Sequence, residues 1–252
     1  MKKILIAATM VVALTLSAAA ATKKLAPDAT RKGPALPPGK PVVPALCNPC
    51  LFYSGDLNPN DGQATGFSDE DTLLISGSST YAAVNIPKGI TASLTGILFN
   101  IQADANFDPF NATYDVRQGV SDGNGGTSVA SGTANITVAT TGRVFLGVTE
   151  YSVLVTIPTV SLTGGEEYWF NVTPQCTNGA QDGSCYVGRM FFSNTTQMAN
   201  EQFGHASPPY ELYLNSTYFG FSWTNWCDAS LGLVNGQCRF GSFGLVGTAK
   251  KD

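Results

Sequence analysis

Residues 145–172 read FLGVTEYSVLVTIPTVSLTGGEEYWFNV, and this stretch decides the fold class. In its first half every second residue is large and apolar: Tyr151, Val153, Val155 and Ile157. The same period returns at Tyr168, Phe170 and Val172, after the turn signal LTGG that begins at 162. A period of two in β-branched and aromatic residues is typical of strands with one buried face. The stretch therefore predicts two strands joined by a tight turn.

The same alternation continues along the chain after residue 50. Further strands are expected at 81–86, 97–101, 113–118, 135–139, 143–146, 186–192, 211–214, 217–223 and 239–246. Turn signals separate them, including IPKG from 86, SDGNGG from 121 and TTG from 140. About 10 to 12 strands without crossover helices predict an all-β fold, an antiparallel β-sandwich of jelly-roll-like type. The Gly-rich run 119–132 is expected to be a mobile loop, and 195–202 a helical turn.

The first 46 residues have a different composition. Residues 1–21 carry Lys2 and Lys3, an apolar run and an Ala-rich end, the pattern of a signal peptide cleaved near Ala21. The apolar run is shorter than the roughly 20 residues that a membrane anchor needs. Six of the 14 prolines lie in residues 22–46, which predicts an extended linker. These patterns predict a secreted protein whose β-sandwich domain spans 47–252, with no transmembrane segment after cleavage. A basic arm for an anionic polymer or lipid surface is the alternative for the linker.

The expected domain is acidic. Residues 47–252 contain seven Lys or Arg against 17 Asp or Glu, a net charge of −10. A surface of that sign repels phosphate backbones, so a nucleic-acid partner is not expected.

Six cysteines in an exported chain favour disulfides. Proximity in sequence suggests three local pairs: Cys47 with Cys50, Cys176 with Cys185, and Cys227 with Cys238. Cys47 and Cys50 also form a C-x-x-C motif, but Pro-rich sequence precedes it where a redox motif needs a βαβ setting. A zinc site would need further ligands, and His205 is the only histidine. Redox and zinc roles are the less favoured alternatives.

Catalytic residues are not predicted. The chain has no G-x-S-x-G motif, and His205 is the only imidazole for a hydrolase triad. A glycosidase would need two facing carboxylates. Glu150, Glu166, Glu167, Glu201 and Glu211 are candidates for such a pair.

A calcium ion is a candidate cofactor. Asp56, Asn58, Asn60 and Asp61 resemble the oxygen ligands of a calcium loop, although the EF-hand pattern fails at Asp61 and Phe67. Asx-rich turns without metal are the alternative.

Glycan binding uses exposed aromatic rings beside polar groups. The segment YELYLNSTYFGFSWTNW, residues 210–226, supplies candidate binding residues: Tyr213, Tyr218 and Trp226. Alternation places Tyr213 and Tyr218 outward and Trp223 inward, and core or covering roles for these rings are the alternative.

The order of FYSGDLNPNDGQA, YAAVNIPKG, ASLTGILFNI, TYDVRQG, GGTSVASG, residues 145–172 and FGSFGLVG resembles uncharacterised bacterial secreted β-sandwich domains. The resemblance implies an extracellular accessory or surface role and assigns no site residues. We therefore expect a non-catalytic protein that binds a glycan or another extracellular polymer. An extracellular carbohydrate-active hydrolase and a purely structural matrix protein are the alternatives. The sequence does not indicate the oligomeric state.

Overall fold

The computed structural model describes residues 42–57, 78–103, 109–145, 148–176, 190–195, 205–206, 212–216, 220–225, 233–234, 237–238 and 240–252. Every regular element in these residues is a β-strand, which confirms the all-β prediction. The same residues contain no helix that could cross a membrane. The main strands are β1 (Cys50–Tyr53), β2 (Ser78–Asn85), β3 (Ile90–Ala103), β4 (Pro109–Gln118), β5 (Thr127–Phe145), β6 (Val148–Thr163), β7 (Glu167–Cys176), β11 (Leu212–Ser216), β12 (Phe221–Asn225) and β16 (Phe243–Lys251). Short strands are β8 (Met190–Phe192), β9 (Asn194–Thr195), β10 (His205–Ala206), β13 (Leu233–Val234), β14 (Gln237–Cys238) and β15 (Phe240–Gly241).

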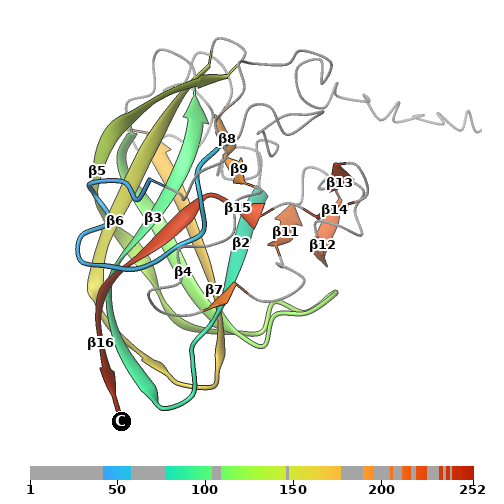
Figure 1. Cartoon of the computed structure of the whole chain (residues 1–252). Coiled ribbons are helices and arrows are strands. Elements are labelled where there is room, and N and C mark those ends of the chain that lie inside the picture. Colours follow the sequence, from blue (N-terminus) through green and yellow to red (C-terminus); the bar gives the residue numbers. More distant parts are fainter. Residues whose placement is uncertain are drawn as a thin grey trace, which may run out of the picture.

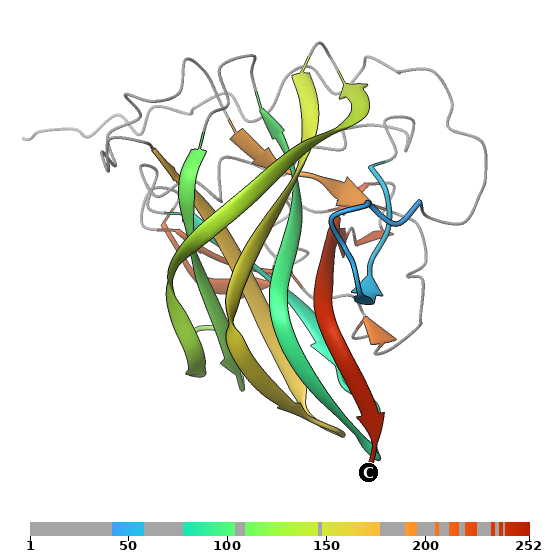
Figure 2. The same ribbon diagram turned by 90° about the vertical axis from the view of Figure 1, so that its left-hand side faces the viewer.

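The main strands form one curled antiparallel sheet (Figure 1; Figure 2). Its order is β1-β16-β3-β6-β5-β4-β7-β2-β11-β12. Outside this order, β8 pairs with β3 and β10 pairs with β2. The long strand β5 joins the two halves, because residues 127–135 pair with β4 and residues 136–145 pair with β6. The strand order thus produces a half-barrel in which two halves of one sheet face each other.

The hydrophobic core lies inside this curl. Phe99 of β3 and Phe170 of β7 are fully buried and belong to different halves of the sheet. The ring of Phe243 lies between them, with its centroid 5.8 Å from that of Phe99 and 6.5 Å from that of Phe170. Val153 and Val155 of β6 point into the same core, as the alternation predicted. Burial of such side chains, about 1.5–3 kcal/mol each, holds the two halves together.

Two sequence-based expectations about turns are wrong. The Gly-rich run 119–132 contains a short turn over 121–124, and from Thr127 it is strand β5. The TTG at 140–142 does not end a strand but forms a bulge inside β5. Gly142 has a φ of 77°, a conformation that a turn and a bulge both require, so the motif alone could not distinguish them. Thr195 belongs to β9, and the rest of the expected helical turn at 196–202 lies outside the described residues.

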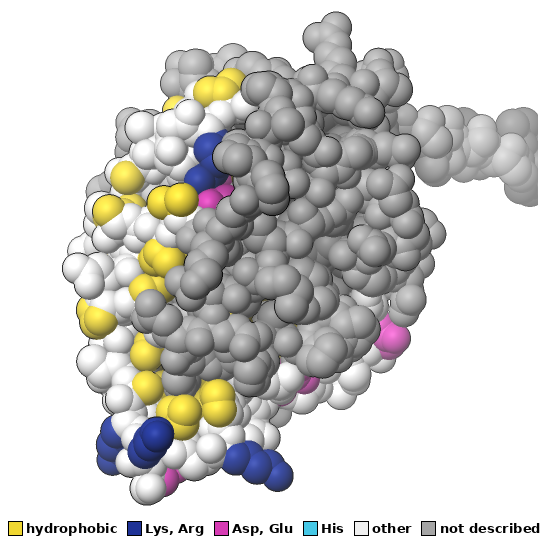
Figure 3. All heavy atoms as spheres, viewed as in Figure 1, with side chains coloured by type: hydrophobic (Ala, Val, Ile, Leu, Met, Phe, Trp, Pro, Cys, Tyr) yellow, Lys and Arg dark blue, Asp and Glu magenta, His cyan; other side chains and the backbone are white. Residues whose placement is uncertain are grey.

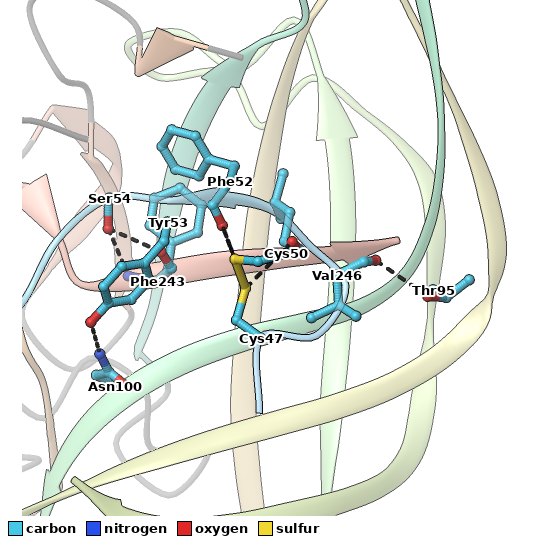
Figure 4. Close-up of a disulfide and its surroundings, with 10 residues drawn as sticks. Cys47, Cys50, Phe52, Tyr53, Ser54, Thr95, Asn100, Phe243 and Val246 are labelled. Atoms are coloured by element: carbon cyan, nitrogen blue, oxygen red, sulfur yellow. Dashed lines mark hydrogen bonds between the residues drawn. A yellow bond between two sulfur atoms is a disulfide. The ribbon is translucent and has the colours of Figure 1, made fainter. Parts of the chain in front are cut away.

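Residues 42–57, which we call the strap, lie beside the upper part of β16 (Figure 2), and their strand β1 pairs with it. Val43 and Leu46 pack against an outer cluster that contains Leu98 and Val246. Residues 42–46 of the expected linker are therefore part of the folded structure. The strap contains the Cys47–Cys50 disulfide (Figure 4).

Candidate functional site

Two groups of polar side chains lie on the outer faces of the two halves of the sheet, and both contain a Tyr, an Asp and an Arg. The first, the strap site, consists of Tyr53, Asp56, Arg143 and Glu150. The second, the tryptophan site, consists of Tyr81, Asp115, Arg117 and Trp223.

The bulge in β5 brings Arg143 into the strap site. Thr140 pairs with Tyr151 and Val144 pairs with Thr149, so three residues of β5 lie opposite Glu150 alone. Within the bulge the Thr141 hydroxyl donates a hydrogen bond to Glu150 Oε2 at 2.8 Å. Arg143 Nε donates to the same oxygen. Thr141 and Arg143, the first and last residues of the bulge, therefore both bind the buried carboxylate of Glu150.

The strap supplies the second carboxylate. Arg143 Nη1 lies 3.1 Å from Asp56 Oδ1, which also accepts a hydrogen bond from the Tyr53 hydroxyl at 2.8 Å. Asp56 Oδ2 accepts a hydrogen bond from the Val42 amide at 2.7 Å. Asn100 of β3 donates to the Tyr53 oxygen at 2.8 Å (Figure 4). Asp56 thus connects both ends of the strap to the sheet.

Burial changes the proton affinity of the strap site. Burial raises the pKa of Glu150, and the Arg143 charge and the Thr141 hydroxyl oppose this rise without cancelling it. Burial lowers the pKa of Arg143, but Glu150, Tyr53 and Asp56 together outweigh it, so the net shift is upward. Burial and the charge of Asp56 raise the pKa of Tyr53. The Arg143 guanidinium pairs with both Asp56 and Glu150, so the two carboxylates share one positive charge.

A cleft of about 390 Å³ lies between the strap and the β5–β6 surface. Aliphatic strap residues line one wall, and Ala139, Thr140, Arg143 and Ser152 line the other. In Figure 3 the coloured part of the surface carries scattered hydrophobic side chains among white atoms, with Lys and Arg side chains gathered at its lower end. An aliphatic lining of this kind lacks the ring surface on which a sugar stacks.

The tryptophan site is built on β4 and β2. Asp115 and Arg117 form an ion pair on the outer face of β4. The Tyr81 hydroxyl of β2 donates a hydrogen bond to Asp115 at 3.0 Å. Ser128 of β5 donates to the other oxygen of Asp115 at 2.6 Å. Burial and the Asp115 charge raise the pKa of Tyr81, as Asp56 does for Tyr53 in the strap site.

Trp223 distinguishes this site from the strap site. The Arg117 guanidinium carbon lies 4.9 Å from the centroid of the Trp223 ring, a cation–π geometry. The indole lies directly over Gly125, where a Cβ atom would come within 2.4 Å of the ring. Trp223 has a φ of 47° and its side chain remains partly exposed. A bulky residue in the left-handed region is a conformational outlier, and such outliers cluster at ligand sites.

The structure corrects the aromatic prediction. Tyr213 points to the outer side of β11, but only 5% of it is exposed because its ring packs edge-on against Trp169, with centroids 4.9 Å apart. It therefore cannot serve as a stacking surface. Trp223, expected inward, packs against the outer cluster with Tyr81 because its positive φ breaks the strand alternation. Tyr218 and Trp226 lie outside the described residues.

The other predicted residues have varied outcomes. The Cys47–Cys50 disulfide is confirmed. Cys176 and Cys238 lie at the ends of β7 and β14, and the cysteines expected to pair with them, Cys185 and Cys227, lie outside the described residues.

The calcium prediction remains untested. Asp56 accepts hydrogen bonds from protein donors through both carboxylate oxygens. The other three expected ligands, Asn58, Asn60 and Asp61, lie outside the described part of the chain. Within the described part, His, Cys, Asp and Glu side chains form no group that could hold a metal ion.

Sequence reasoning missed Arg117, Arg143 and Trp223. A usable signal existed for Arg117, because Asp115 and Arg117 are two residues apart and so share one face of a strand. No model of a known protein family matches the chain, and a search of the curated proteins finds no match. The resemblance to bacterial secreted β-sandwich domains therefore remains a prediction.

Proposed function

We propose that this chain is a secreted, non-catalytic protein of jelly-roll-like β-sandwich type that binds an extracellular glycan at the tryptophan site. The observation that carries the proposal is Trp223, a partly exposed indole held in an unusual backbone conformation and stacked by Arg117. Aromatic rings beside hydrogen-bonding groups are the usual means of binding sugars.

Polar groups beside the indole support this assignment. Asp122 and Asn124 are exposed residues of the turn at 121–124, which is anchored to Trp223 by a hydrogen bond from the Gly123 amide to the Trp223 carbonyl. Asp122 also accepts a hydrogen bond from the Asn225 amide at 3.2 Å. Neutral sugar hydroxyls could bind to these oxygens beside the ring, whereas an anionic polymer would meet the acidic surface of the domain.

Binding to a glycan array and to insoluble polysaccharides tests the proposal. Trp223→Ala should weaken binding about tenfold or more, because it removes the stacking surface. Arg117→Lys, which keeps the charge but loses the planar stack, should weaken it less. Val144→Ala is the matched control, because it truncates a side chain that is 56% exposed in the other half of the sheet.

The possible outcomes separate this proposal from the two alternatives. Equal binding by the wild type and Trp223→Ala, with both folded, would exclude the tryptophan site. Turnover of a bound polysaccharide would favour the hydrolase. No binding to any glycan, together with self-association in sedimentation experiments, would favour the structural matrix protein.

A further inference from the structure

Three reactive side chains meet beside the strap site without contact with solvent. Gln102 of β3, Glu150 of β6 and Ser193, just after β8, are each fully buried. Gln102 and Glu150 are directly paired across the two strands, so their side chains leave the same face of the sheet. A primary amide, a carboxyl group and a hydroxyl group are thus enclosed together.

The hydroxyl of Ser193 contacts the amide of Gln102. Gln102 Nε2 donates a hydrogen bond to Ser193 Oγ at 3.3 Å, so the serine proton remains available for another acceptor. Glu150 Oε1 is buried and has no hydrogen-bond partner, so it is open to a proton from a neighbouring hydroxyl. Burial raises the pKa of this carboxyl, and Ser193 is among the groups that oppose the rise. Glu150 Oε2 is occupied by Thr141 and Arg143. A nucleophile between an electrophile and a base is the arrangement that covalent chemistry requires.

We propose that Ser193 and Gln102 become joined by an ester bond, with Glu150 as the proton acceptor. Glu150 takes the proton of Ser193 Oγ as that oxygen attacks Gln102 Cδ and forms the new C–O bond. Glu150 then passes the proton to Nε2, the C–N bond breaks, and ammonia leaves. The products are one ester and one ammonia molecule, Glu150 is regenerated, and no oxidant or external reactant is needed.

The surroundings favour the product. A buried carboxyl with a raised pKa is a stronger base than an exposed one, and this brings it closer to the weakly acidic hydroxyl. Ammonia takes up a proton in neutral water, which opposes the reverse reaction. Water is excluded from all three side chains, so hydrolysis of the ester is slow. The bond would fix the segment after β8 to β3.

A second amide provides an internal control. Asn100 Nδ2 donates to Ser242 Oγ at 2.7 Å, closer than Gln102 is to Ser193, but its other partners are the Tyr53 and Ser152 hydroxyls. A base next to the serine, and not proximity alone, defines the proposed reaction. Asn100 should therefore remain an amide.

Peptide mass spectrometry of the purified full-length chain tests the proposal, because trypsin places the two serines on different peptides. Cleavage after Lys88, Arg117, Arg189 and Arg239 puts Gln102 and Asn100 in 89–117, Ser193 in 190–239 and Ser242 in 240–250. The expected product joins 89–117 to 190–239, has the mass of both peptides less one ammonia, and is split by hydroxylamine, which cleaves esters.

Three variants complete the experiment. Ser193→Ala and Glu150→Gln should each abolish the joined peptide, and Ser242→Ala should leave it unchanged. Unlinked 89–117 and 190–239 from the folded wild type, a deamidated Gln102, or a link from 89–117 to 240–250 would each overturn the proposal. The test does not depend on glycan binding, because the tryptophan site contributes none of these residues.

Discussion

The strap site and the tryptophan site use the same three residue types to different ends. In each, a buried tyrosine donates to an aspartate that pairs with an arginine. The strap site adds the fully buried Glu150 and is covered by residues 42–57. The tryptophan site adds the partly exposed Trp223. The covering layer therefore separates a buried polar network from one that is partly exposed to solvent.

The charge balance of the two sites differs in the same way. Arg143 serves two buried carboxylates, so its loss leaves two negative charges without compensation. Arg117 serves one, Asp115, which has further donors in Tyr81 and Ser128. The comparison predicts that matched substitutions will have unequal effects on stability.

Replacement of Arg143 should have the largest effect. Arg143→Met is expected to lower the free energy of unfolding by about 3–5 kcal/mol, the usual result of breaking a buried ion pair on one side. Arg117→Met, the matched control, should cost about 1 kcal/mol, because its partner Asp115 is more exposed than Glu150 and keeps other donors. Urea unfolding followed by circular dichroism measures both.

A second change sharpens this prediction. Glu150→Gln in the Arg143→Met background should recover part of the lost stability, because it removes one of the two uncompensated charges. Equal losses for Arg143→Met and Arg117→Met, or no recovery in the double variant, would mean that the strap does not exclude water from its site.

The sequence predicted the inner faces of the sheet well and the outer faces poorly. Alternation alone placed Val153, Val155 and Phe170 in the core, because one face of each strand must be buried wherever the two halves meet. The outer faces depend on what covers them. Tyr213 was correctly placed outward, yet Trp169 of β7, two strands away in the sheet, covers it. Such coverage depends on strand order, which local periodicity does not encode.

Arg143 and Trp223 show the same limit at the level of single residues. Arg143 reaches Glu150 only because the bulge around Gly142 turns it toward the strap, and the sequence TTG equally indicates a turn. Trp223 faces the outer side because the register of β12 shifts there and its φ is positive, and the sequence around it indicated neither. Asp115 and Arg117, by contrast, follow from spacing on a regular strand and could have been predicted.

Removal of the disulfide should have the next-largest effect on stability. Replacing Cys47 and Cys50 together by alanine should lower the free energy of unfolding by about 2 kcal/mol, the chain-entropy estimate for so short a loop. Hydrogen exchange should then rise in the strap and in β16, which pairs with β1. Protection in β4 and β12 should stay unchanged. Increased exchange in β4 or β12 would show that the two sites are coupled rather than independent.

The smallest expected effect appears at alkaline pH and compares the two tyrosines. The pKa values of Tyr53 and Tyr81 are both raised above the ordinary 10.0, chiefly by burial and next by the neighbouring aspartates. Above pH 10 the unfolded chain releases tyrosine protons that the folded chain keeps, so the free energy of unfolding falls as pH rises. Each tyrosine should contribute about 1.4 kcal/mol of this loss at pH 11.

Phenylalanine variants show how much of the stability lost above pH 10 comes from each site. Tyr53→Phe and Tyr81→Phe should each flatten the decline above pH 10, and the double variant should flatten it further. In the folded protein, tyrosinate absorbance should show Tyr81 ionising before Tyr53, because Tyr53 is more deeply buried and lies near two carboxylates instead of one. The opposite order would place water under the strap and reverse the distinction between a covered site and an accessible one.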